Sequence, residues 1–154
     1  MNQLAPKRVS DSLTEQIQIL MPEHINGYKR LFGGKLMEWI DVVGAVVARR
    51  HSGCNVTTAC VDNLIFKAAA YVNSTIVLKG CMTYVGRTSM EVRVDTFVEK
   101  LSGEQKMINT AYLVLVALDD NDRPTSVPPL LLESEEQEIE FAAGQTRSEY
   151  RKNR

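Results

Sequence analysis

The stretch GGKLMEWIDVVGAVVARRHSG, residues 33–53, decides the fold. Its apolar residues recur at helical spacing, with Leu36, Ile40 and Val43 on one face and further apolar residues on another, which predicts a helix over residues 34–52. Basic residues in the last turn, followed by Gly53, are typical signals for the end of a helix. Because this helix is apolar on nearly every side, we expect it to be buried.

The segment before this helix predicts a strand and then a loop. Residues 14–20, TEQIQIL, alternate polar and apolar side chains around Ile17 and Ile19, as expected for a half-buried strand. Residues 21–30, MPEHINGYKR, contain Pro22, Asn26 and Gly27, a composition that favours turns.

Four β-rich stretches follow the helix, at residues 56–66, 74–85, 88–99 and 106–118. The third alternates apolar residues from Met90 to Val98 with charged residues from Glu91 to Glu99, so its two faces should differ. The order of strand, buried helix and four strands predicts an α+β domain, in which an antiparallel β-sheet wraps around one long central α-helix.

The length of 154 residues fits one compact domain. We assign residues 1–13 to an N-terminal tail, residues 14–132 to the domain, and residues 133–154 to a charged C-terminal helix and tail. Ser134 can cap a short helix that ends near Ala143, and residues 144–154 are expected to form a solvated end. No internal repeat or low-complexity tract is present in the sequence.

The overall charge and hydropathy exclude several partners. A formal charge of −1 and a pI of about 6.1 give no basic surface for phosphate-backbone binding, so nucleic acid is not an expected partner. The sequence has no run of 18 or more apolar residues, and its N-terminus lacks the apolar core of a signal peptide. We therefore expect no membrane partner and a cytoplasmic location.

Cysteine and histidine offer little for catalysis or metal binding. Cys54, Cys60 and Cys81 are odd in number and lack CxxC spacing, so we interpret them as reduced, mostly buried packing residues. His24 and His51 lie in no HExxH or GxSxG context and are expected to be exposed. The sequence therefore predicts no metal site, and the Walker A and GxGxxG patterns of nucleotide-binding proteins are absent.

Asp41 is the most informative single residue, because it lies among apolar positions of the predicted helix. Burial of an unpaired carboxylate costs several kcal/mol, so Asp41 should be hydrogen-bonded, neutralised or turned toward a cavity. A purely structural aspartate, bonded to the backbone of a neighbouring loop, is the alternative. Glu38, three residues earlier, is interpreted as a solvated residue near the helix start.

Two glycine-containing segments can bind an anion or a developing oxyanion. Gly33 and Gly34 open the helix, where unpaired backbone N–H groups can stabilise a tetrahedral intermediate, or simply form a tight turn. Residues Val85, Gly86, Arg87, Thr88 and Ser89 combine a flexible backbone, a guanidinium and two hydroxyls, which suits a phosphate group. Taken by itself, this second segment favours an ordinary hairpin turn over a phosphate site.

Four segments together resemble the acyl-CoA thioesterase family of hotdog-fold proteins, which includes brain acyl-CoA hydrolase and its short bacterial homologues. They are MPEHIN (21–26), LFGGKLMEWID (31–41), VTTACVDNLIFK (56–67) and YVGRTSMEVRV (84–94). The Asn, the FGG, the Asp seven positions after the second Gly, and the GRTS turn follow the family's order and approximate spacing. The resemblance spans about residues 14–118, and departs from the family at residues 27–30 and at Ala68.

The resemblance implies hydrolysis of acyl-CoA to a carboxylic acid and coenzyme A in fatty acid metabolism, with no cofactor beyond the coenzyme A of the substrate. It implies that Asp41 is the catalytic carboxylate, Asn26 its partner, and the turn at residues 85–89 part of the coenzyme A site. It also implies paired hotdogs, often arranged as a trimer of dimers, in which Asn26 of one chain meets Asp41 of the other.

The corresponding mechanism places the thioester carbonyl at the amides of Gly33 or Gly34. Asp41 acts either as a general base toward water or as a nucleophile that forms an anhydride, and Asn26 orients water or substrate. Thr57 and Thr58, at the start of the strand after the helix, are interpreted as ordinary strand residues, with a place in the lining of the site as the alternative. The rival function is a non-catalytic acyl-CoA-binding or sensor protein of the same fold. A hotdog dehydratase is disfavoured, because the catalytic histidine of such an enzyme has no counterpart in this sequence.

Overall fold

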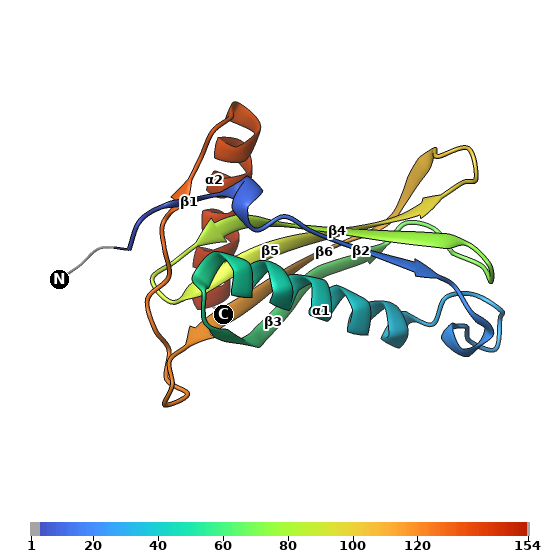
Figure 1. Cartoon of the computed structure of the whole chain (residues 1–154), viewed down its shortest axis with the longest axis horizontal. Helices are drawn as coiled ribbons and strands as arrows, with labels where there is room; N and C mark the ends of the chain where they lie inside the picture. Colours follow the sequence, from blue (N-terminus) through green and yellow to red (C-terminus); the bar gives the residue numbers. More distant parts are fainter. Residues whose placement is uncertain (1–3, 154) are drawn as a thin grey trace.

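The computed structural model of the protein describes residues 4–153, with the exception of the side chain of Asn63. A five-stranded antiparallel sheet curves around the long helix α1 (Gly33–Ser52), as the hotdog fold requires (Figure 1). Its strands, in the spatial order β2-β4-β5-β6-β3, are β2 (Thr14–Ile19), β4 (Thr75–Val85), β5 (Ser89–Glu99), β6 (Gln105–Leu118) and β3 (Asn55–Phe66).

Smaller elements complete the chain. The short strands β1 (Lys7–Arg8) and β7 (Leu130–Leu131) pair in parallel, and two 3₁₀ helices, η1 (Val9–Asp11) and η2 (Pro22–His24), flank β2. A second helix, α2 (Glu135–Lys152), lies at one end of the sheet, on the face opposite to α1 (Figure 1). No helix within residues 4–153 is both long enough and apolar enough to span a bilayer.

The prediction of the central helix is confirmed. Leu36, Ile40 and Val43 are almost completely buried against the concave face of the sheet. The helix ends at Gly53, whose φ of 70° lies in the left-handed region that glycine adopts without strain. One stripe of α1 nevertheless remains exposed, so the expectation of a helix buried all round is wrong for the single chain.

The four predicted strands after α1 are confirmed within one or two residues at each end. In β5 the apolar set from Met90 to Val98 faces α1, whereas Glu91, Arg93 and Asp95 face away from it. Alternation of side chains across a strand therefore identified both faces of β5 correctly.

The strand β2 is confirmed, but its orientation is the reverse of the one expected. Ile17 and Ile19 are 61% and 51% exposed on the outer face, while Gln16 and Gln18 are half-buried on the side of α1. Among the described strands β2 is an edge strand that pairs with β4 alone, so few neighbours cover its outer face. The alternation predicted the strand but could not show which of its faces meets the core.

The helix α2 continues nine residues beyond its expected end near Ala143, because its second half packs on the sheet. Gly144 lies directly against Tyr84 and Glu91, where a Cβ atom would be 2.6 Å from the Cβ of Tyr84. Arg147 donates two hydrogen bonds to the buried Glu91 carboxylate, at 2.8 and 3.0 Å, and Arg151 donates a third at 3.3 Å. Residues 144–152 are therefore helical and ion-paired rather than a solvated end.

Residues 7–12 do not behave as a free tail. Val9 and Ser12 are buried, and the segment reaches the last turn of α1, where Lys7 Nζ donates to the carbonyl of Arg50. His51 is fully buried, with Nε2 2.8 Å from the carbonyl oxygen of Pro128, so the expectation of an exposed His51 is wrong. Burial lowers the pKa of His51 below its ordinary value of 6.5.

The three cysteines are free thiols and half-buried, in keeping with a packing role. Burial raises the pKa of the Cys81 thiol, which disfavours the reactive thiolate. Within residues 4–153, no cluster of three or more His, Cys, Asp and Glu side chains has an arrangement that could hold a metal ion.

Candidate active site

Asp41 lies in the third turn of α1, on the stripe of the helix that the sheet leaves uncovered. Its Oδ1 accepts a hydrogen bond of 2.6 Å from Oγ1 of Thr58 on β3. The neighbouring residues Met37 and Val42 are 45% and 51% exposed. Asp41 is thus hydrogen-bonded, as expected, but it is exposed in the single chain and its partner is a strand hydroxyl instead of a loop backbone.

Thr58 is a candidate site residue that the sequence interpretation treated as an ordinary strand position. Its strand register explains its position: Thr58 pairs with the buried Leu115 of β6, so its side chain points to the α1 side of the sheet. Thr57 pairs with Val116 and points to the opposite face. The register of β3 against β6 shows that Thr58, and not Thr57, faces α1. The sequence alone does not distinguish the two threonines.

The first turn of α1 presents backbone amides without a side-chain cap. Phe32 occupies the N-cap position, and its side chain cannot accept a hydrogen bond from the helix amides. Within residues 4–153, no hydrogen bond uses the N–H groups of Gly33 and Gly34 as donors. A Cβ at Gly34 would lie 2.7 Å from the Phe32 ring, so glycine permits the close approach of that ring. These amides are available to an oxyanion or another acceptor.

Asn26 lies in the loop that precedes α1 and is held by its own backbone neighbours. Its Oδ1 accepts from the N–H groups of Tyr28 and Arg30, at 2.8 and 3.3 Å. Lys29, inside this turn, has a φ of 61°, which is unusual for a residue with a side chain. The amide oxygen of Asn26 therefore shapes the loop, while its Nδ2 group donates to none of the described residues and can donate to a ligand.

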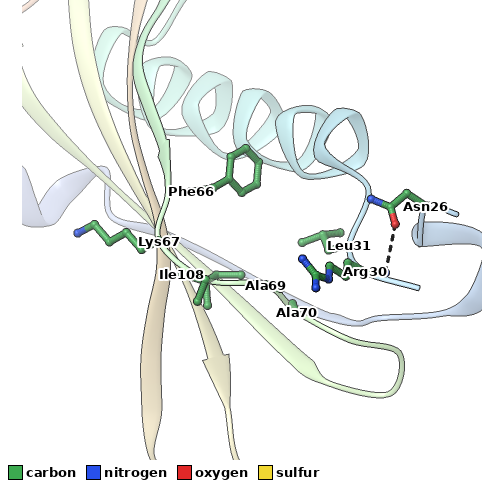
Figure 2. Close-up of a pocket in the computed structure, with 9 residues that line it drawn as sticks. Asn26, Arg30, Leu31, Phe66, Lys67, Ala69, Ala70 and Ile108 are labelled. Atoms are coloured by element: carbon green, nitrogen blue, oxygen red, sulfur yellow. Dashed lines mark hydrogen bonds between the residues drawn. The ribbon is translucent and has the colours of Figure 1, made fainter. Parts of the chain in front are cut away.

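A hollow of about 330 Å³ lies beside Asn26 (Figure 2). Leu31, Phe66 and Ile108 line it with apolar side chains (Figure 2), and Ala68, Ala69, Ala70, Arg30 and Lys67 complete the lining. Such a mixture of apolar walls and a few polar groups is typical of a small-molecule site. Of the large apolar residues near the helix start, Leu31 lines this hollow, whereas Phe32 is exposed and Trp39 is in the core.

The turn at residues 85–89 is a tight hairpin end. Gly86 N–H donates to the carbonyl of Ser89 at 2.9 Å, and the carbonyls of Arg87 and Thr88 accept from Val127 and Ala117. The Arg87 side chain is exposed and forms no ion pair with any described residue. The turn is therefore rigid in its backbone and offers a free guanidinium at its tip.

One chain does not bring the predicted site residues together. Asn26 and Asp41 share no hydrogen bond, and Gly34 lies seven residues before Asp41, about 10 Å along the helix axis. The turn at residues 85–89 adjoins the opposite end of α1 (Figure 1). Ser89 pairs with Val116 of β6, two residues before Leu118, and Leu118 pairs with Asn55, which follows the last turn of α1. The two ends of a 20-residue helix are about 30 Å apart.

Comparison with known proteins adds independent information. A model of the thioesterase superfamily matches residues 28–102. An uncharacterised acyl-CoA thioester hydrolase of Bacillus subtilis is 36% identical over 136 residues, which cover 88% of this chain and 79% of that protein. The acetyl-coenzyme A thioesterase of Mus musculus is 27% identical over 87% of this chain, which spans only 24% of that longer protein.

Solved structures of similar proteins agree over nearly the whole fold. An apo-hexameric acyl-CoA thioesterase superposes with a TM-score of 0.92 at 33% identity, over 97% of both chains. The acyl-CoA hydrolase of Staphylococcus aureus, solved with butyryl coenzyme A and coenzyme A, gives a TM-score of 0.90 at 29% identity, over 96% of this chain and 90% of that one.

The same Staphylococcus aureus enzyme has been solved with alanine in place of an asparagine, an aspartate or a threonine. In that enzyme the aspartate lies 15 residues after the asparagine and 17 residues before the threonine. At 36% identity over most of both chains, the likeness to the Bacillus protein shows that this chain belongs to the acyl-CoA thioester hydrolases of the thioesterase superfamily.

Proposed function

We propose that the protein is an acyl-CoA hydrolase in which Asp41 carries out the chemical step. The observation that carries this proposal is the short hydrogen bond between Asp41 and Thr58 on an uncovered face of α1. The separations of Asn26, Asp41 and Thr58 along this chain, 15 and 17 residues, equal those of the three residues varied in the Staphylococcus aureus hydrolase.

The Asp41–Thr58 pair is suited to activate a water molecule or to attack a thioester. The Thr58 hydroxyl fixes Oδ1, and within residues 4–153 no hydrogen bond occupies Oδ2. Oδ2 can then accept a proton from water as water adds to the carbonyl carbon, or can attack that carbon itself. The leaving group is a thiolate, which departs without a strong general acid, so the lack of a histidine at Asp41 does not prevent the reaction.

The remaining groups of the site come, in our proposal, from a second chain. A two-fold axis between residues 37 and 38 of the exposed α1 stripe would place Gly34 of one chain at the level of Asp41 of the other, because the two helices then run antiparallel. It would also bring the turn at residues 85–89 to the helix start of the partner. The free edge of β3 and the exposed side chains of Met37, Val42 and Phe66 are the surfaces that such pairing would cover.

In this arrangement each component has a separate role. The amides of Gly33 and Gly34 stabilise the oxyanion, Asn26 orients water or the thioester through its Nδ2 group, and Arg87 binds a phosphate of coenzyme A. The hollow beside Asn26 receives the acyl group. We further propose a trimer of such dimers in the cytoplasm, supported by the hexameric state of the similar thioesterase, and no cofactor other than the substrate's own coenzyme A.

A thiol-release assay with acyl-CoA esters of increasing chain length tests this function. We expect release of free coenzyme A from the parent protein and loss of most of this activity in Asp41→Asn, with folding and acyl-CoA binding retained. Binding of acyl-CoA without turnover by the parent would instead support the non-catalytic binding protein. Near-normal turnover by Asp41→Asn would contradict the role of the carboxylate.

A further inference from the structure

We propose that His24 is a positioning residue, which aligns the loop carrying Asn26 with the first turn of α1. It does not contact the reacting atoms; it acts through the residues that do. The inference rests on the proposed function, because it concerns how Asn26 and the amides of Gly33 and Gly34 are held in place. Three contacts, each made by a different part of His24, support it.

The first contact is made by the imidazole ring. Nδ1 of His24 accepts a hydrogen bond of 3.0 Å from the backbone N–H of Met21, which closes the 3₁₀ turn η2. Only a neutral ring with its proton on Nε2 can accept this bond. Nε2 faces the largely exposed Glu23 carboxylate, with Oε1 at 3.9 Å, which is too long for a hydrogen bond.

The second contact joins the ring to the body of α1. The rings of His24 and Trp39 meet edge to face, with centroids 5.0 Å apart and an angle of 80° between their planes. Trp39 is buried and lies two residues before Asp41 on the same helix. The distance between the two ring centroids is typical of favourable aromatic pairs. The position of the His24 ring is therefore fixed by the helix that carries the catalytic carboxylate.

The third contact is made by the backbone. The carbonyl of His24 accepts from the N–H of Phe32 at 2.8 Å, and Phe32 is the N-cap that precedes Gly33 and Gly34. Between these two residues the loop closes on itself, since Asn26 N–H donates to the carbonyl of Arg30 at 2.8 Å. The loop is thus a compact unit whose orientation toward α1 depends on His24 at its base.

These contacts predict a specific kinetic effect. Loss of the Nδ1 acceptor would loosen η2 and let the Asn26 loop tilt relative to the helix start. The tilt would change the geometry of the reacting groups more than the binding of coenzyme A, which Arg87 provides at another segment. Because small misplacements of catalytic groups cost up to about a hundredfold in rate, a loss near tenfold in kcat is expected from one weakened hydrogen bond.

The test compares His24→Asn with His24→Leu, two side chains of nearly the same size and shape. Both lose the ring contact with Trp39, but only Asn retains an acceptor close to the backbone N–H of Met21. We expect kcat of His24→Asn to exceed that of His24→Leu by about tenfold, with KM values within about twofold of each other. Glu23→Gln is the control for the neighbouring charge and should match the parent.

Thermal unfolding and size-exclusion chromatography of each variant separate this role from a merely structural one. Equal kcat values for the Asn and Leu variants, or a difference in kcat matched by an equal difference in folded fraction, would overturn the proposal. A parent protein that hydrolyses no acyl-CoA would contradict the proposed function instead. The two failures are therefore distinguishable in one set of assays.

Discussion

Replacement of Thr58 by valine tests the Asp41–Thr58 pair with little change in shape. Valine removes the hydroxyl that donates to Asp41 Oδ1 at 2.6 Å and keeps a β-branched side chain on an exposed strand position. A hydrogen bond to a charged group is worth about 1.5–3 kcal/mol, which corresponds to a loss of about 10- to 150-fold in kcat/KM. The lower end of this range applies if water still reaches the carboxylate in the assembled protein.

The assay is steady-state thiol release from one acyl-CoA ester, together with thermal unfolding of each variant. Thr57→Val is the matched control, because Thr57 is the adjacent residue of β3, is also exposed, and points to the other face of the sheet. Its activity should equal that of the parent. Equal activities of the two valine variants would refute the assignment of Thr58, and with it the idea that a fixed Oδ1 prepares Asp41 for catalysis.

Three further predictions follow from the structure. Asn26→Ala and Asp41→Asn chains should each be inactive. Unfolding and co-refolding them together should restore a substantial part of the parental turnover, because a mixed dimer contains one intact shared site. No recovery in verified mixed dimers would exclude the cross-subunit arrangement. Arg87→Ala should mainly raise KM for acyl-CoA, as should added salt in the parent, and an unchanged KM would remove Arg87 from the binding site. Burial lowers the pKa of His51, so below pH 6.5 the unfolded chain binds a proton that the native chain does not. The free energy of unfolding should therefore decrease between pH 7 and 5, by at most about 1.4 kcal/mol per pH unit from this residue. Thermal unfolding of His51→Gln should depend less on pH than that of the parent.

The helices and strands were largely predictable from the sequence. Which face of a helix or strand packs against a neighbouring element was not. The spacing of apolar residues gave α1, and alternation gave both faces of β5. Ile17 and Ile19 show the limit of this reasoning, since a period of two is the same whichever face is buried. The full length of α2 depends on Glu91, whose position opposite Arg147 is known only once the sheet is assembled.

The candidate site was predictable to a similar degree. Asp41 stood out because a carboxylate among valines and isoleucines demands an explanation. Thr58 did not stand out, because threonine is common in strands and only the register of β3 shows that its hydroxyl reaches the helix. The distance from the turn at residues 85–89 to the start of α1 was hidden, because only the pairing of β5 and β3 with β6 shows which end of the helix the turn adjoins.

The length of α1 has a consequence for how the enzyme responds to its own concentration. Under the proposed arrangement an isolated chain holds two incomplete half-sites and cannot turn over substrate; one lies at the helix start, and the other extends from Asp41 in the third turn to the turn at residues 85–89. Specific activity should then fall when the protein is diluted below its dissociation constant. An acyl-CoA molecule that touches both chains binds only the assembled form, so by mass action it opposes this dissociation. Substrate supply would in this way regulate the amount of active enzyme without any separate effector site.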